Sequence, residues 1–209
     1  MKAKIEMIYL QYRSNAVFSS VGNKMKLIYK WSLLFFLLAF MSSMHAQAKG
    51  SLPQDPYKHF FNETWGDFSE ELANAKKQGK KGVMFFFEMD ECPYCHYMKK
   101  NVLNQPDVQA YFREHFLLFP VDIEGDVEIV NLKGQETKQK DFAFREHRVR
   151  ATPVFMFYDL EGKKMYRHTG KTSGPKEFKI IGDYLVKGIY KEMSFTRYKR
   201  KMRKTERVK

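Results

Sequence analysis

The two cysteines of this 209-residue chain stand three positions apart, in the segment Cys92-Pro93-Tyr94-Cys95. The segment follows an apolar run and precedes a stretch with helical spacing, which predicts both sulfurs on the first turn of a helix. Cysteines placed there can close a disulfide with little backbone movement. The unpaired amides at a helix start favour a thiolate at Cys92, and thiolate is the species that attacks a disulfide. We therefore expect Cys92 to be the nucleophile, Cys95 the resolving thiol, and Pro93 and Tyr94 the residues that tune the redox pair.

The elements that must position this pair can be predicted from hydrophobic periodicity and turn residues. A short apolar run between glycine and the motif suits a central strand covered on both faces. Asp67 and Glu70 have capping-box spacing at the start of a helix. We expect strands at 82–88, 117–123, 153–159 and 163–168, helices at 68–78, 138–147 and 175–191, and a loop or irregular insert at 124–135. Strands and helices that alternate in this way predict an α/β fold with one mixed sheet.

Composition excludes several classes of protein. With 44% hydrophobic and 16% aromatic residues the chain is too apolar for wholesale disorder, and two cysteines cannot staple a small disulfide scaffold. The net charge of +13 is unevenly spread, because residues 197–209 hold eight Lys and Arg against one Glu. We expect a solvated basic tail at 193–209, attracted weakly to anionic membrane or to an acidic partner. Tyr198 is the one aromatic residue of 197–209. A single aromatic ring offers little surface for base stacking, so we expect no nucleic-acid binding.

The N-terminus resembles an export signal. Lys24, Lys26 and Lys30 precede an apolar run at 31–41 that is too short for a permanent membrane span, and Ala46 and Ala48 are small residues of the kind that a signal peptidase requires. We expect cleavage after Ala48, with an uncleaved anchor as the alternative and with 1–24 as a candidate over-extended start. The expected organisation is a signal peptide at 1–48, a lead-in at 49–59, a domain at 60–192 and the basic tail. The domain would then work in the periplasm, where thiols can be oxidised.

Residues 60–190 resemble the thioredoxin-like superfamily. The resemblance rests on the strand before Cys92-Pro-Tyr-Cys95, on Val121-Asp-Ile123, on the segment from Ala151 to Phe157, on Asp159-Leu-Glu-Gly162 and on Gly170. The chain is similar to secreted bacterial thioredoxin-related proteins, among them the periplasmic thioredoxins linked to sulfur oxidation and the C-terminal domain of the transmembrane thiol:disulfide interchange reductase.

This resemblance implies a thioredoxin-like fold and a role as reductant of other exported proteins, with a membrane electron partner and no cofactor. It implies that Pro153 is a cis-proline packed against the disulfide, and that Thr152 offers backbone hydrogen bonds to a substrate. In one respect the chain departs from the family. Where thioredoxins carry a buried acid, six residues before the first cysteine, this chain has Phe86. Glu88 lies nearer the motif. It is a candidate substitute for that acid, but we expect it at a solvated strand end, as is usual for Glu.

Two other functions remain open. Cys92-Pro-Tyr-Cys95-His96 matches the attachment pattern of c-type haem, although proline is awkward at the start of a haem-anchoring helix. Cys92, Cys95, His96 and Met98 are soft ligands that could handle copper, but two thiols cannot complete a structural zinc site. The simpler interpretation makes His96 a helix-surface residue and Met98 core packing, with no metal site.

Overall fold

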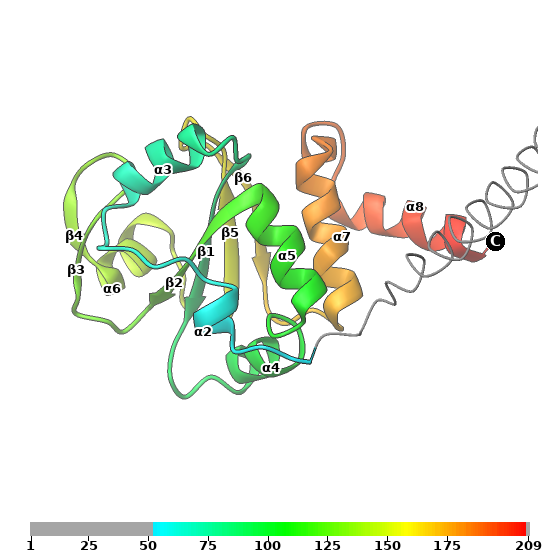
Figure 1. The fold of residues 1–209 in the computed structure, drawn as a ribbon, viewed down its shortest axis with the longest axis horizontal. Helices are drawn as coiled ribbons and strands as arrows, with labels where there is room; N and C mark the ends of the chain where they lie inside the picture. The colour runs from blue at the N-terminus through cyan, green and yellow to red at the C-terminus, as the bar shows by residue number, and fades with distance from the viewer. Residues whose placement is uncertain (1–51, 208–209) are drawn as a thin grey trace, which may run out of the picture. The chain divides into compact units, whose positions relative to one another are not determined.

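The computed structural model describes residues 52–207, so the predicted signal peptide and its cleavage point lie outside the described residues. A four-stranded sheet has the order β2-β1-β5-β6 and is formed by β1 (Gly82–Glu88), β2 (Phe116–Asp122), β5 (Val154–Tyr158) and β6 (Lys164–Thr169). β1 pairs with β2 in parallel and with β5 antiparallel, and β5 pairs antiparallel with β6. The predicted mixed sheet is confirmed (Figure 1).

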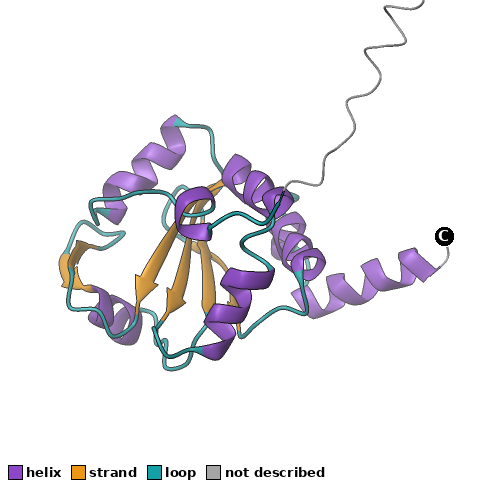
Figure 2. Ribbon diagram, turned by 60° about the horizontal axis from the view of Figure 1, so that its bottom comes forward, coloured by secondary structure: helices purple, strands orange, loops and turns teal. Residues whose placement is uncertain are grey.

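Helices lie on both sides of this sheet (Figure 2). The helices that follow the chain from its described start are α2 (Pro56–His59), α3 (Phe68–Lys77), α4 (Pro93–Asn101) and α5 (Pro106–His115). After β2 come α6 (Gln139–Asp141), a π-helix (Phe142–Glu146), α7 (Pro175–Val186), a 3-10 turn (Ile189–Lys191) and α8 (Phe195–Arg207). Among the described residues, no helix has the length and apolar character needed to cross a membrane.

Two separate cores explain why β1 is apolar almost throughout. Met84 and Phe86 face a core that also contains both cysteines and side chains from α4, α5 and α7. Phe85 and Phe87 face a second core with Phe68 of α3. Because successive side chains of a strand point to opposite faces, a strand between two cores must be apolar at nearly every position.

Local sequence sets the ends of the elements near the site. The Asp67 carboxylate accepts a hydrogen bond of 2.9 Å from the Glu70 amide and so caps α3 as predicted. At the start of β1, a side chain at Gly82 would overlap the carbonyl oxygen of Tyr158, so only glycine allows β1 to lie this close to β5.

Three segments differ from the sequence-based prediction. Residues 124–135 are not simply a loop, because β3 (Glu128–Val130) forms a hairpin with β4 (Glu136–Lys138) and buries Ile129. Part of the lead-in at 49–59 is helical, since α2 lies within it and Pro56 is buried. The basic tail is not simply solvated: it forms α8, and Phe195 and Tyr198 join the core. In each case, apolar side chains within a polar stretch bind the segment to the domain.

Candidate active site

Cys92 and Cys95 are joined in a disulfide at the start of α4, with their Cα atoms 5.2 Å apart. Cys92 is the N-cap residue, and its Sγ accepts a hydrogen bond of 3.0 Å from the Cys95 amide. Pro93 occupies the first helical position, where an amide would have no partner in the helix. Cys92 keeps 2% of its surface exposed and Cys95 none. Cys92 is therefore the more exposed residue of the pair, and an amide donor is already in place for its thiolate.

The outer surface of the motif is aromatic and basic. Tyr94 is 55% exposed, so it presents a large side chain beside the disulfide. The ammonium of Lys171 lies 5.3 Å from the centroid of the Tyr94 ring and 4.4 Å from that of Tyr97. A cation over aromatic rings holds them in place. Lys171 had no signal in the sequence, because it follows β6 and reaches the motif only in the folded chain.

The peptide bond between Thr152 and Pro153 is cis, as the resemblance implied. Pro153 directly precedes β5, and Val154 pairs with Phe87 near the end of β1. The Thr152–Pro153 bond and the loop to Cys92 therefore lie at the same end of the two central strands. The Pro153 carbonyl accepts a 2.8 Å hydrogen bond from Gly170. In the part of the chain that the structure describes, no backbone hydrogen bond uses the amide or carbonyl of Thr152. A substrate role for Thr152 and Pro153 stays a prediction.

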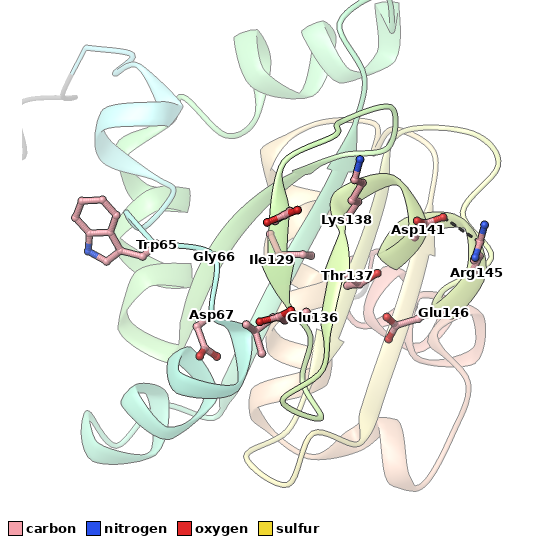
Figure 3. Close-up of a pocket in the computed structure, with 12 residues that line it drawn as sticks. Trp65, Gly66, Asp67, Ile129, Glu136, Thr137, Lys138, Asp141, Arg145 and Glu146 are labelled. Atoms are coloured by element: carbon pink, nitrogen blue, oxygen red, sulfur yellow. Dashed lines mark ion pairs between the residues drawn. The ribbon is translucent and has the colours of Figure 1, made fainter.

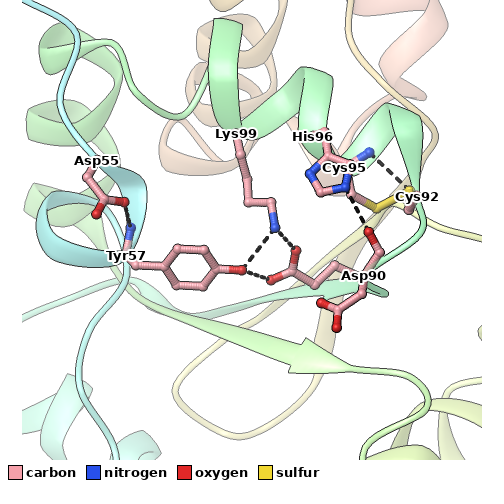
Figure 4. A network of polar contacts seen from close by, with 8 residues as sticks. Asp55, Tyr57, Asp90, Cys92, Cys95, His96 and Lys99 are labelled. Carbon is pink, nitrogen blue, oxygen red and sulfur yellow. Dashed lines mark hydrogen bonds and ion pairs between the residues drawn. A yellow bond between two sulfur atoms is a disulfide. The ribbon is translucent and has the colours of Figure 1, made fainter.

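A buried charged network lies between β1, α4 and the lead-in (Figure 4). The Glu88 carboxylate accepts hydrogen bonds of 2.6 Å from the Tyr57 hydroxyl and from the Lys99 ammonium. Lys99 also donates to the Tyr57 oxygen over 3.0 Å. Glu88 is 7% exposed, so the expectation of a solvated strand end was wrong. The partners that allow its burial come from other segments, α2 and α4.

This network also perturbs the pKa values of its members. Burial opposes the charge on Lys99, but the hydrogen bonds to Glu88 and Tyr57 outweigh it and raise the pKa of the ammonium. Burial, and next the bond to Glu88, raise the pKa of Tyr57. The lysine is thus held charged and the tyrosine neutral. On the same face of β1, Phe86 is fully buried between the rings of Phe61 and Phe155, at 5.7 and 4.8 Å.

The remaining soft side chains near the motif have other partners. A ring nitrogen of His96 lies 2.7 Å from the Asp90 carbonyl oxygen, and its side chain is exposed. The Met98 sulfur is fully buried and accepts from the Thr172 amide at 3.4 Å, which confirms Met98 as core packing. Within residues 52–207 we find no group of three His, Cys, Asp or Glu side chains arranged to hold a metal ion. None of these contacts favours the copper or haem alternatives.

A separate groove of about 590 Å³ lies between the segment before α3, the β3–β4 hairpin and the π-helix (Figure 3). Trp65 on its border is fully exposed, and Asp141 pairs with Arg145 at 2.9 Å. No residue of the cysteine motif lines it, so its side chains have no part in the site described above.

Comparison with known proteins finds several chains that are similar to this one. The disulfide bond reductase DsbH of Chlamydia pneumoniae is 26% identical over 107 residues, which cover 51% of this chain and 62% of that protein. A thioredoxin-fold protein from Helicobacter pylori aligns with a TM-score of 0.50 and 22% identity, over 61% of this chain and 85% of that one. A thioredoxin from Thermus thermophilus aligns with a TM-score of 0.46 and 25% identity, over 61% of this chain and 88% of that one.

The chain spans less than two thirds of the length of DsbH, and the Helicobacter structure supports the fold alone. The family assignment rests on a wider match, because the model of the thioredoxin-like domain covers residues 68–185, more than half of the chain. That range contains the cysteine pair, the cis-proline and the whole four-stranded sheet. The protein belongs to the thioredoxin-like domain family.

Proposed function

We propose that the protein is an exported thiol–disulfide oxidoreductase that reduces disulfides in other extracytoplasmic proteins. The observation that carries the proposal is the Cys92–Cys95 disulfide at the N-terminus of α4, with the Cys95 amide directed at the Cys92 sulfur. Such a donor stabilises negative charge on sulfur more than it stabilises a neutral thiol. The pair therefore suits a reversible two-electron exchange better than a structural cross-link.

The reaction proceeds in two exchanges. In the reduced protein the Cys92 thiolate attacks one sulfur of a substrate disulfide, forms a mixed disulfide and releases the other substrate sulfur as a thiolate. Cys95 then loses its proton and attacks the Cys92 sulfur, which restores the Cys92–Cys95 disulfide and releases the second substrate thiol. Two electrons have passed from the cysteine pair to the substrate. A dithiol donor must reduce the pair again, and we propose that this donor is a membrane protein.

We assign substrate binding to the surface beside Cys92, at the end of the sheet where β5 begins. The unused backbone groups of Thr152 suit an extended peptide segment, which binds through main-chain hydrogen bonds. The exposed ring of Tyr94 supplies apolar surface beside the motif, while Pro153 itself is buried and fixes the direction of the chain at Thr152. The export part of the proposal rests on the charged and apolar pattern of residues 24–48, which lies outside the described residues.

Glu88 is the acid that we assign to the resolving cysteine. It shares a face of β1 with Phe86, the position where the family has its acid, and is two residues closer to the motif. Its partner Lys99 follows Cys95 by four residues on α4, which places the two side chains on one side of the helix. A carboxylate in this network can take up the proton that Cys95 releases.

The proposal is tested by reduction of insulin disulfides with a chemical dithiol as electron donor. We expect turnover by the parent protein, none by Cys92→Ser, and an accumulating mixed disulfide with Cys95→Ser. Undiminished turnover by either variant would contradict the mechanism. The direction of electron flow is tested separately. The two measurements are the reduction potential of the cysteine pair against glutathione and the redox state of the pair trapped in cells. A potential near −270 mV, at the reducing end of the range for this fold of about −270 to −120 mV, supports the reductant role. A value at the oxidising end with an oxidised pair in cells overturns it.

A further inference from the structure

The start of α8 is fixed on the domain. Phe195 and Tyr198 are buried, and both rings contact the ring of Tyr184 on α7, at 5.4 and 5.6 Å between centroids. Lys199 pairs with Glu177 of α7. Burial favours the neutral form of Glu177, but hydrogen bonds from Lys199 and Ser173 outweigh it and lower its pKa to about 2. Because the first turns are held in place, the side of α8 that faces away from α7 is fixed relative to the domain.

The opposite side of α8 carries a cationic face, formed by Arg197, Arg200, Lys201 and Lys204. With 100° between successive residues, these four side chains fall within an arc of about 100°, and the buried aromatic residues lie on the other side of the helix. The four cations are exposed and line a hollow of about 410 Å³ together with Met193. Among the residues that the structure describes, none of the four has an ion-pair partner.

The charge of this face is exceptional for the chain. Residues 49–196 hold 23 Lys and Arg against 22 Asp and Glu, a net charge of +1, whereas residues 197–209 hold eight against one. Figure 1 shows α8 extending past α7, away from the sheet. The cationic face therefore projects from a nearly neutral domain on a rigid support, where another surface can reach it.

From these observations we propose that the cationic face of α8 docks on the anionic headgroups of a phospholipid membrane. This interaction surface is independent of the proposed redox function. Stable protein interfaces are built around buried aromatic and apolar anchors, which this face lacks. Nucleic-acid surfaces add exposed aromatic residues for stacking, and the aromatic residues of α8 are buried. An array of Lys and Arg without either feature suits phosphate headgroups, which attract it through charge alone.

The test compares full-length protein on vesicles of phosphatidylcholine alone and of phosphatidylcholine with phosphatidylglycerol in equal parts. Any binding through the apolar N-terminal segment is common to all variants and appears on both vesicle types. We expect tighter binding to the anionic vesicles, and a loss of that preference as ionic strength rises from about 0.01 M to 0.15 M and the Debye length falls from about 30 to 8 Å. The triple variant R200Q/K201Q/K204Q should lose about fivefold in affinity per removed charge, or roughly a hundredfold in total.

A matched control removes three exposed lysines from the α3 region, in K76Q/K77Q/K81Q. We expect this control to keep its preference for anionic vesicles within a few-fold of the parent. Equal losses in both triple variants would overturn the proposal, because the effect would then follow total charge rather than the cationic face. The proposal also fails if the parent binds both vesicle types equally, or if it binds an immobilised acidic polypeptide through these residues but shows no preference for anionic vesicles.

Discussion

The buried pair of Glu88 and Lys99 allows a quantitative test, because the protein carries an exposed pair of the same length. The Glu88–Lys99 and Asp126–Lys140 distances are both 2.6 Å. The side chains of the first pair are 9% and 16% exposed, and those of the second pair 66% and 45%. Distance therefore cancels in the comparison. The difference between the two acids reports burial together with their other partners, the Tyr57 hydroxyl at Glu88 and Lys138 at Asp126.

We expect Glu88→Gln to lower the free energy of unfolding by about 2–3 kcal/mol. The amide can still accept one hydrogen bond, but Lys99 is left charged in a buried place without its counter-ion, and full loss of a partner costs about 3–5 kcal/mol. Asp126→Asn should cost much less than Glu88→Gln, because water screens an exposed pair. For a domain of this size the first change corresponds to a fall in Tm of about 4–12 °C.

Urea unfolding of the oxidised protein at pH 7 measures both free energies. The Glu88→Gln/Lys99→Met double variant completes the cycle, and we expect it to lose less than the sum of the two single variants, since both charges are then absent. If Glu88→Gln and Asp126→Asn cost the same, or if the two single losses simply add, the network does not stabilise the protein as argued. The same Glu88→Gln protein should resolve the mixed disulfide at Cys92 more slowly, with an altered pH profile, if Glu88 takes the proton from Cys95.

Two further changes test other parts of the structure. Burial, and then the charges of Lys164, Arg167 and Lys133, lower the pKa of His147 from 6.5 to about 4. The unfolded chain binds this proton first, so stability should fall as the pH drops from about 6.5 to 4, by up to about 3 kcal/mol. Urea titrations at several pH values should show this loss in the parent and a smaller one in His147→Gln. At Gly182, an added methyl group would overlap the Tyr111 ring on α5. Gly182→Ala should therefore cost about 1–3 kcal/mol by thermal unfolding, and an increase in Tm would refute the close contact of α5 and α7.

The sheet could be predicted because each of its strands carries its own signal. β1 has the bounds expected from its apolar run, and β5 begins one residue later than expected, at the position after Pro153. The cysteine pair falls at a helix start for an equally local reason, since the strand ends and Pro93 opens the helix. Fold and motif thus depend on short-range patterns that one sequence is sufficient to show.

The β3–β4 hairpin and α8 gave weaker signals. Of the six residues in these two strands, Ile129 is the one that is buried, so the alternation that marks a half-buried strand is missing. In α8, the two buried aromatic residues are hidden among basic ones, and a charge run of this kind is usually solvated. Both segments are ordered by contacts with distant parts of the chain, which local periodicity does not contain.

The burial of Glu88 could be predicted only in part from the sequence. Met84, Phe86 and Glu88 share one face of β1, and the first two face the core, so the register alone could have placed the carboxylate at the margin of that core. Whether such a residue is solvated depends on its partners, and Tyr57 comes from a segment 31 residues away. At the usual position of the acid, the Phe86 side chain is fully buried and packed against two other rings, and an unpaired charge in such apolar surroundings is costly. Two residues further along β1, at the end of the strand, Lys99 and Tyr57 can reach the carboxylate of Glu88. The carboxylate therefore lies at the position in this core where a charge can be paired.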